Sequence, residues 1–110
     1  NLEGKIHGQS VRVPLIDVSM ADLNFYLNKA TKLDEIHALL ESYANDSMKG
    51  ILSIDSKYRV SSDFLGSAYS SIVAKDLSVQ VGNMLKIMAW YDNESGYANR
   101  ILDMAEFILG

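Results

Sequence analysis

The sequence predicts an α+β domain, in which a largely antiparallel, mixed sheet carries two helices on one face. Segments with strand or helix character occur in the order β, β, α, several β, α, and most strand-like segments are joined by connections of hairpin length. Such an order, without regular β-α alternation, is typical of this class. The 110 residues, 48% hydrophobic and 22% charged, suit one globular domain over residues 1–110.

Two strands are predicted before the first helix. Val11–Ile16 is rich in apolar residues but contains the only proline, which favours a strand end, an edge or a bulge. Val18–Leu27 also has strand character, and its apolar residues change phase by one position near Ala21 and Asp22. Since strand side chains alternate with period two, we expect a long antiparallel strand with a bulge or bend there.

A helix is predicted from Thr31, because a threonine followed three residues later by Asp34 is the spacing of an N-terminal cap. Apolar residues then recur at spacings of three and four, the mark of an amphipathic helix. This stripe consists of Leu33, Ile36, Leu40 and Tyr43.

Five short strands and a final helix are predicted in the second half. The strands are Ile51–Ile54, Tyr58–Ser61, Ser70–Ala74, Leu77–Val81 and Met84–Trp90. Gly82 and Asn83 separate the last two and indicate a tight hairpin. The last strand is apolar on both faces except at Lys86, so we expect it to be central. The final helix has the stripe Tyr97, Ile101, Met104 or Ala105, and Ile108.

Composition excludes several functional classes. The net charge is −4 and the ten Lys and Arg residues are dispersed, which argues against nucleic-acid binding. No apolar run approaches the roughly 20 residues that cross a bilayer, and the start is unlike a signal peptide. We therefore expect a cytoplasmic protein without a membrane partner, and we interpret the chain as a piece of a longer protein. Phosphate-binding glycine motifs are absent, and the carboxylates do not cluster as a metal site would require.

Few residues are candidates for chemistry on spacing alone. The absence of cysteine excludes a cysteine nucleophile from this chain. His7 and His37 lie 30 positions apart and form no acid-base pair, so we expect both on the surface. Arg12 is either a solvent-facing strand residue or a guanidinium that binds phosphate or carboxylate with two parallel donors.

The segment from Ala89 to Met104 also has two interpretations. In the structural one, Asn93 or Ser95 caps the last helix and the nearby aromatic residues belong to the core. In the functional one, the carboxamide of Asn93, with one acceptor and two donors, pairs with an amide-bearing ligand. Residue spacing does not decide between them.

Several motifs resemble one family over essentially the whole chain. WYDNESGYANR, residues 90–100, resembles the W-Y-D-N-E-x-G-Y-x-N-R segment of phosphorylating glyceraldehyde-3-phosphate dehydrogenases. GKIHGQSVRVP, DVSMADL, KGIL and VSSDFLG are similar to further segments of that family, in the same order. The resemblance implies that residues 1–110 are the C-terminal part of a catalytic domain, without the Rossmann domain that binds NAD.

The resemblance also implies roles for three residues. Arg12 matches an arginine that binds substrate or inorganic phosphate, and Asn93 matches an asparagine that hydrogen-bonds the nicotinamide carboxamide. Tyr97 matches a tyrosine near the nicotinamide pocket. The family oxidises glyceraldehyde 3-phosphate with NAD and inorganic phosphate to 1,3-bisphosphoglycerate, in a glycolytic homotetramer. No catalytic residue of the family falls in this chain, and His7 is not its catalytic histidine.

Two departures limit what the resemblance implies. The position of Ser95 usually holds an aromatic residue, so we expect less packing surface beside the cofactor pocket. Without a cysteine the isolated chain is predicted to be inactive. Alternatives are a fragment of an erythrose-4-phosphate dehydrogenase, which Tyr91 and Tyr97 disfavour, or a subunit-association module without activity.

Overall fold

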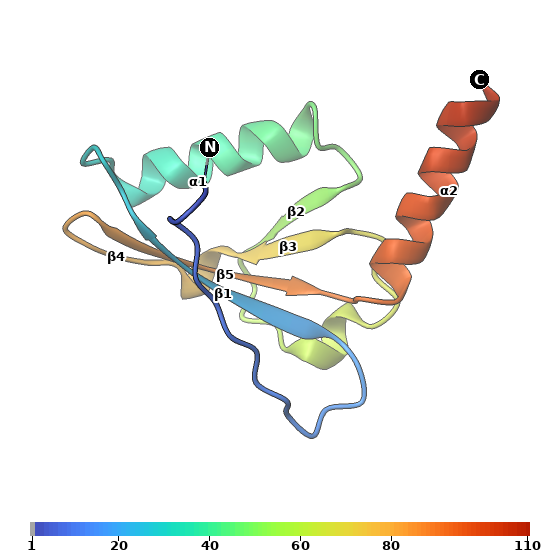
Figure 1. Cartoon of the computed structure of the whole chain (residues 1–110), viewed down its shortest axis with the longest axis horizontal. Helices are drawn as coiled ribbons and strands as arrows, with labels where there is room; N and C mark the ends of the chain where they lie inside the picture. Colours follow the sequence, from blue (N-terminus) through green and yellow to red (C-terminus); the bar gives the residue numbers. More distant parts are fainter. Residues whose placement is uncertain (1) are drawn as a thin grey trace.

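The computed structural model describes residues 2–110, and a five-stranded mixed sheet forms its centre. The strands are β1 (Ser19–Tyr26), β2 (Leu52–Asp55), β3 (Ser71–Ala74), β4 (Val79–Val81) and β5 (Met84–Tyr91). The helices are α1 (Leu33–Asn45) and α2 (Ser95–Leu109), with two short 3-10 turns, η1 (Ser61–Phe64) and η2 (Lys75–Leu77). The predicted α+β class is confirmed (Figure 1).

The strand β5 organises the sheet, whose order is β1-β5-β3-β2 with β4 also paired to β5. β5 is antiparallel to β1, β3 and β4, whereas β2 and β3 are parallel. The predicted central position of β5 and its hairpin to β4 are therefore confirmed. Gly82, in the turn of that hairpin, has a φ of +56°, a conformation that glycine adopts without steric strain.

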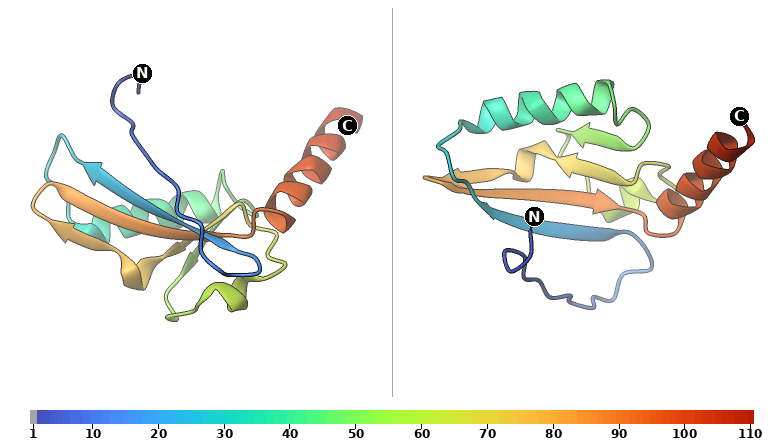
Figure 2. Two further views of the ribbon diagram at one scale, coloured as in Figure 1. Left: turned by 60° about the horizontal axis from the view of Figure 1, so that its bottom comes forward. Right: turned by 45° about the horizontal axis from the view of Figure 1, so that its top comes forward.

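The helix α1 covers one face of the sheet, as the right view of Figure 2 shows. Its Leu33, Ile36 and Leu40 pack against a buried cluster from β2, β3 and β5, which consists of Leu52, Val73, Leu85, Ile87 and Ala89. This packing confirms the predicted stripe except for Tyr43, whose side chain is 48% exposed. A smaller cluster of Val18, Phe64 and Ile72 includes Trp90 at its edge.

The helix α2 departs from the predicted architecture because it does not lie on the sheet. It extends away from the end of β5 (Figures 1 and 2), and Gly96 is its only buried residue. The apolar residues toward its end, Ile101, Leu102, Met104, Phe107, Ile108 and Leu109, are more than half exposed. The prediction of two helices on one face was therefore wrong for this helix, since neither buried cluster of residues 2–110 includes a residue of its stripe.

Two predicted strands do not form. Residues 11–16 are an exposed coil outside the sheet (Figure 1), because Pro14 lacks a donor and no strand of residues 2–110 pairs with them. Tyr58 has a φ of 50°, which breaks the predicted strand Tyr58–Ser61, and the chain turns into η1.

Three local predictions were wrong as well. β1 pairs with β5 residue by residue from Ser19 to Tyr26, so the predicted bulge is absent. Val18, at a φ of 66°, lies outside the strand, whereas Met20 and Leu23 both lie inside it, so the change of phase puts apolar side chains on both faces of β1. Thr31 does not cap α1, which begins after Lys32 without a side-chain cap. His37 is buried, at 6% exposure, whereas His7 is exposed as predicted.

Candidate functional site

The corner between β5 and α2 is built on the carboxylate of Asp92, which is only 3% exposed. One oxygen accepts hydrogen bonds from the backbone N–H groups of Glu94 at 3.0 Å and Ser95 at 2.8 Å. The other accepts from the N–H of Gly66 at 2.8 Å, 26 positions earlier in the chain. Asp92 therefore caps the start of α2 and also ties the corner to the loop after η1.

These hydrogen bonds stabilise the charged form of Asp92. The bond from Ser95 is the largest cause that lowers its pKa, and those from Gly66 and Glu94 add to it. Burial acts in the opposite direction but does not outweigh them. Asp92 is thus an ionised cap, and the proposed capping by Asn93 or Ser95 was wrong, since neither side chain bonds the helix start.

Two further residues fix α2 at its first turns. A Cβ on Gly96 would lie 2.9 Å from the backbone oxygen of Tyr69, so only glycine permits this close approach. Arg100 donates to the backbone oxygen of Gly50 at 3.2 Å and to the hydroxyl of Ser70 at 3.3 Å. The corner is therefore held by two separate parts of the chain, the loop between η1 and β3 and the residue Gly50.

Asn93 and Tyr97 project from this anchored corner into solvent. Asn93 is exposed, and the side chain of Tyr97 is 69% exposed. Among residues 2–110, neither side chain makes a hydrogen bond or ion pair. The donors and acceptor of Asn93 are thus available to a ligand, and its backbone position is fixed by Asp92 next to it.

Arg12 is not brought together with Asn93 and Tyr97 by any contact in the part of the chain that is described. It lies in the exposed coil before β1 and has no hydrogen-bond or ion-pair partner among residues 2–110. Its guanidinium is free, as a ligand for phosphate would need to be. The rigid strand on which the functional interpretation placed Arg12 is absent.

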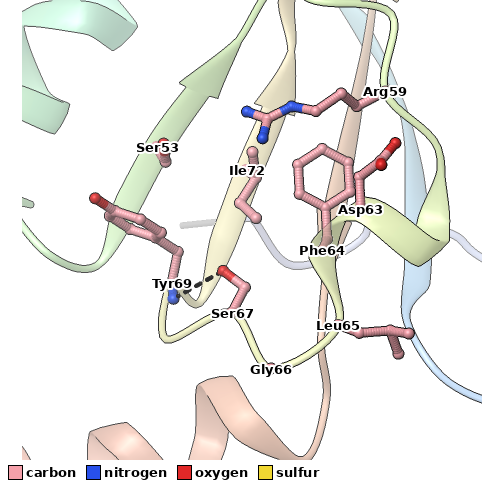
Figure 3. Close-up of a pocket in the computed structure, with 9 residues that line it drawn as sticks. All are labelled: Ser53, Arg59, Asp63, Phe64, Leu65, Gly66, Ser67, Tyr69 and Ile72. Carbon is pink, nitrogen blue, oxygen red and sulfur yellow. Dashed lines mark hydrogen bonds between the residues drawn. The ribbon is translucent and has the colours of Figure 1, made fainter.

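A hollow of about 270 Å³ is lined in part by the loop that Asp92 holds, including Gly66 and Ser67 (Figure 3). Arg59 lies over the ring of Phe64, with its guanidinium carbon 5.1 Å from the ring centre. The other apolar or aromatic lining residues are Leu65, Tyr69 and Ile72. A second hollow, of about 450 Å³, lies between the end of α1 and β2. Neither is lined by Arg12, Asn93 or Tyr97.

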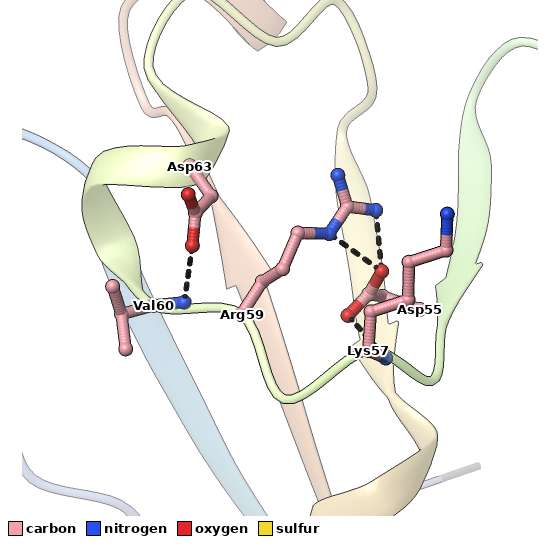
Figure 4. Close-up of polar contacts among 5 residues, drawn as sticks. All are labelled: Asp55, Lys57, Arg59, Val60 and Asp63. Atoms are coloured by element: carbon pink, nitrogen blue, oxygen red, sulfur yellow. Dashed lines mark hydrogen bonds and ion pairs between the residues drawn. The ribbon is translucent and has the colours of Figure 1, made fainter.

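The guanidinium of Arg59 is paired with the carboxylate of Asp55, as Figure 4 shows. Its Nε donates to a carboxylate oxygen of Asp55 at 2.7 Å, and a second guanidinium nitrogen contacts the same oxygen. The backbone N–H of Lys57 donates to the other oxygen at 3.2 Å. Burial alone would raise the pKa of Asp55, but Arg59 and Lys57 lower it. This cluster stabilises the chain between β2 and η1 rather than offering a free anion site.

Two further observations concern other classes of site. Within residues 2–110, no three His, Cys, Asp or Glu side chains are grouped closely enough to hold a metal ion. No helix in the same part of the chain has the length and apolar character needed to cross a membrane.

The fold and the corner thus define a class of domain, one in which a mixed sheet presents an amide side chain from a capped strand-to-helix junction. Comparison with known proteins makes the class more specific. The family described as glyceraldehyde 3-phosphate dehydrogenase, C-terminal domain, matches residues 1–93. The chain therefore belongs to this family.

Relatives with assigned names agree with the family match. The chain is similar to glyceraldehyde-3-phosphate dehydrogenase of Helicobacter pylori, with 53% identity over 98% of this chain and 32% of the relative. It is also similar to glyceraldehyde-3-phosphate dehydrogenase 3 of Saccharomyces cerevisiae, with 42% identity over 97% of this chain and 32% of the relative. The chain thus spans about a third of the length of these relatives.

The structure also gives roles to further motif residues, among which Trp90 was already predicted to belong to the core. In WYDNESGYANR, Trp90 stacks on Phe64 with ring centres 5.8 Å apart, Asp92 caps the helix, and Gly96 and Arg100 fix it. A glycine inside a helical pattern was the available signal for close backbone approach. These residues hold the corner, while Asn93 and Tyr97 remain exposed on it.

Proposed function

We propose that this chain is the C-terminal part of the catalytic domain of an NAD-dependent dehydrogenase. The parent protein would oxidise glyceraldehyde 3-phosphate and phosphorylate it to 1,3-bisphosphoglycerate, as part of glycolysis. Family membership supports this assignment, and the observation that carries it is the free carboxamide of Asn93 on a corner fixed by Asp92. The relatives named above are glyceraldehyde rather than erythrose dehydrogenases, which favours that substrate.

The residues of the corner fit a nicotinamide. Asn93 offers two donors and an acceptor, which match the acceptor and donors of a carboxamide, and Tyr97 presents a ring that is 69% exposed. The bound cofactor would supply the hydride acceptor. In this proposal Asn93 orients the nicotinamide, Tyr97 borders it, and Arg12 binds the phosphate of the substrate or inorganic phosphate.

The isolated 110-residue chain is expected to be inactive, because it contains no cysteine to form a covalent bond with the aldehyde. Purified chain mixed with NAD, inorganic phosphate and glyceraldehyde 3-phosphate should produce no NADH above the protein-free rate. The absorbance of NADH checks this, with the full-length parent as the positive control. Sustained phosphate-dependent NADH production by the chain would contradict the proposal that the catalytic nucleophile lies outside these 110 residues.

In the full-length parent, Arg12→Ala should lower kcat/KM for the phosphorylated aldehyde or inorganic phosphate by roughly 10- to 100-fold, since a charge-assisted hydrogen bond contributes about 1.5–3 kcal/mol. Initial rates over a range of both substrates measure the change. Lys29→Ala removes an equally exposed positive charge and should leave both values near those of the wild type. Unchanged kinetics in Arg12→Ala would remove Arg12 from the site.

We further propose that the parent is a cytoplasmic homo-oligomer. The apolar residues exposed on the sheet face opposite α1, including Tyr26, Val81 and Met84, and the unpartnered stripe of α2 support this proposal. Contiguous apolar surface of this kind is typical of protein interfaces. The remainder of the parent and its other subunits would cover it.

A further inference from the structure

His37 is an unusual residue for the buried side of α1. Its side chain is only 6% exposed, and its Nε2 atom has no hydrogen-bond partner among residues 2–110. A neutral imidazole is tolerated in such a place, whereas an imidazolium would lose its hydration without a bonded partner. The docked position of α1 therefore favours the neutral form of His37.

The charged groups around His37 strengthen this preference. Lys75 of η2 reaches α1 and donates to Glu41 at 2.7 Å, which joins the helix to the sheet layer. Burial is the largest cause that lowers the pKa of His37, and the positive charge of Lys75 is the second. Asp34 and Glu41 of α1 itself act in the opposite direction but do not outweigh them.

The strands under α1 supply no other partner for a protonated His37. The carboxylate of Asp55, at the end of β2, is bound by Arg59. β3 has no titratable residue, and Lys86 of β5 is paired with Asp22 at 2.8 Å on the opposite face of the sheet. η2 also carries Asp76, whose Oδ1 is buried without a hydrogen-bond partner in the described part of the chain, but Asp76 is not among the groups that shift the pKa of His37. Lys75 is the charged group outside α1 that does so.

We propose that His37 makes the docking of α1 on the sheet sensitive to pH, so that transient release of the helix becomes up to about tenfold more frequent as the solution is acidified between about pH 7 and 5. Release breaks the contact between Lys75 and Glu41 and exposes the apolar side of α1 that Leu33, Ile36 and Leu40 form. The direction follows from linkage: stability that depends on a neutral histidine is complete above its unfolded pKa of about 6.5 and falls below it.

Amide hydrogen exchange of the 110-residue chain at pH 7.5 and 5.5, corrected for intrinsic exchange, tests the proposal. The opening equilibrium of α1 should rise by up to about tenfold at the lower pH, the limit for one group that binds its proton only when the helix is open. The amides of β5 should change less. An equal change in β5 would mean that His37 acts on the whole fold, and no change in α1 would overturn the proposal.

Two variants separate His37 from other causes. His37→Leu fills the site with a side chain that does not titrate, so its α1 should show less than about a twofold change over the same range. His7→Gln removes the only other histidine, which is exposed, and should behave as the wild type. A pH response that persists in His37→Leu, or disappears in His7→Gln, would contradict the assignment.

Lys75→Met tests the surroundings of the imidazole, and proton NMR titration of His37 gives a readout that does not depend on stability. Without Lys75, Glu41 becomes free to pair with an imidazolium, so the pKa of His37 should rise and the response of α1 should weaken. An unchanged titration of His37 in Lys75→Met would show that Lys75 does not contribute to the pH response of α1. A wild-type His37 that titrates at or above the ordinary histidine value would overturn the proposal even if His37→Leu fails to fold.

Discussion

Replacing Asp92 by alanine should lower the free energy of unfolding by about 3 kcal/mol at pH 7, because three N–H groups lose a charged acceptor. These are the donors of Gly66, Glu94 and Ser95, all within 3.0 Å of the carboxylate. Such a loss is a large part of the stability of a small domain. Urea unfolding followed by the fluorescence of the single tryptophan, Trp90, measures it.

Asn93→Ala is the matched control. It truncates the next residue of the same corner, but that side chain is exposed and makes no bond in the described part of the chain. The free energy of unfolding should therefore change by less than about 0.5 kcal/mol. If Asn93→Ala destabilised the chain as much as Asp92→Ala, the division between an anchoring aspartate and an available asparagine would be wrong.

The pH dependence of the Asp92 effect has a definite sign. Hydrogen bonds hold the folded pKa of Asp92 below its unfolded value of about 3.9, so the unfolded state gains the proton first. The stabilisation is complete above about pH 4 and is lost as the pH falls through the folded value. The difference between the wild type and Asp92→Asn should shrink below pH 4, and a constant difference would argue against an ionised cap.

Sequence patterns predicted the sheet well where burial decides the structure. β5 is central and α1 packs through Leu33, Ile36 and Leu40. A strand that is apolar on both faces must be covered on both, and a helix with one apolar stripe must bury that stripe. Residues 11–16 have the same apolar character but no partner among the described residues, and a strand without a partner ladder does not form. The apolar stripe of α2 likewise predicted packing on the sheet, and it remains exposed because no described residue covers it.

The candidate site was predicted more through resemblance than through residue chemistry. Asn93 was one of two open interpretations, and no residue pattern distinguishes a capping asparagine from one that binds a ligand. The structure separates them because Asp92 occupies the capping position. His37 was expected on the surface because it forms no acid-base pair with His7, but that argument does not address burial. In α1 His37 follows the stripe position Ile36 directly, and a residue at the edge of an apolar stripe can be buried.

Gly96→Ala is expected to have the second largest effect, a loss of about 2 kcal/mol in the free energy of unfolding. The new Cβ would stand 2.9 Å from the backbone oxygen of Tyr69 and 3.6 Å from the Cα of Ser70. Backbone atoms cannot rotate away as a side chain can, so α2 or the loop at Tyr69 must shift, and such overpacking costs about 1–3 kcal/mol. Alanine has a better helix propensity than glycine by about 1 kcal/mol, so the expected loss is the strain of the contact reduced by that amount.

Gly8→Ala makes the same substitution where nothing lies within 4 Å and the backbone needs no positive φ, so its stability should stay within about 0.5 kcal/mol of the wild type. Chemical denaturation of both variants gives the comparison. In the full-length parent, Gly96→Ala should also weaken cofactor binding, because a shifted α2 moves Asn93 and Tyr97 together. If Gly96→Ala stabilised the chain, helix propensity would outweigh the contact with Tyr69, and the close approach would not be what requires glycine at this corner.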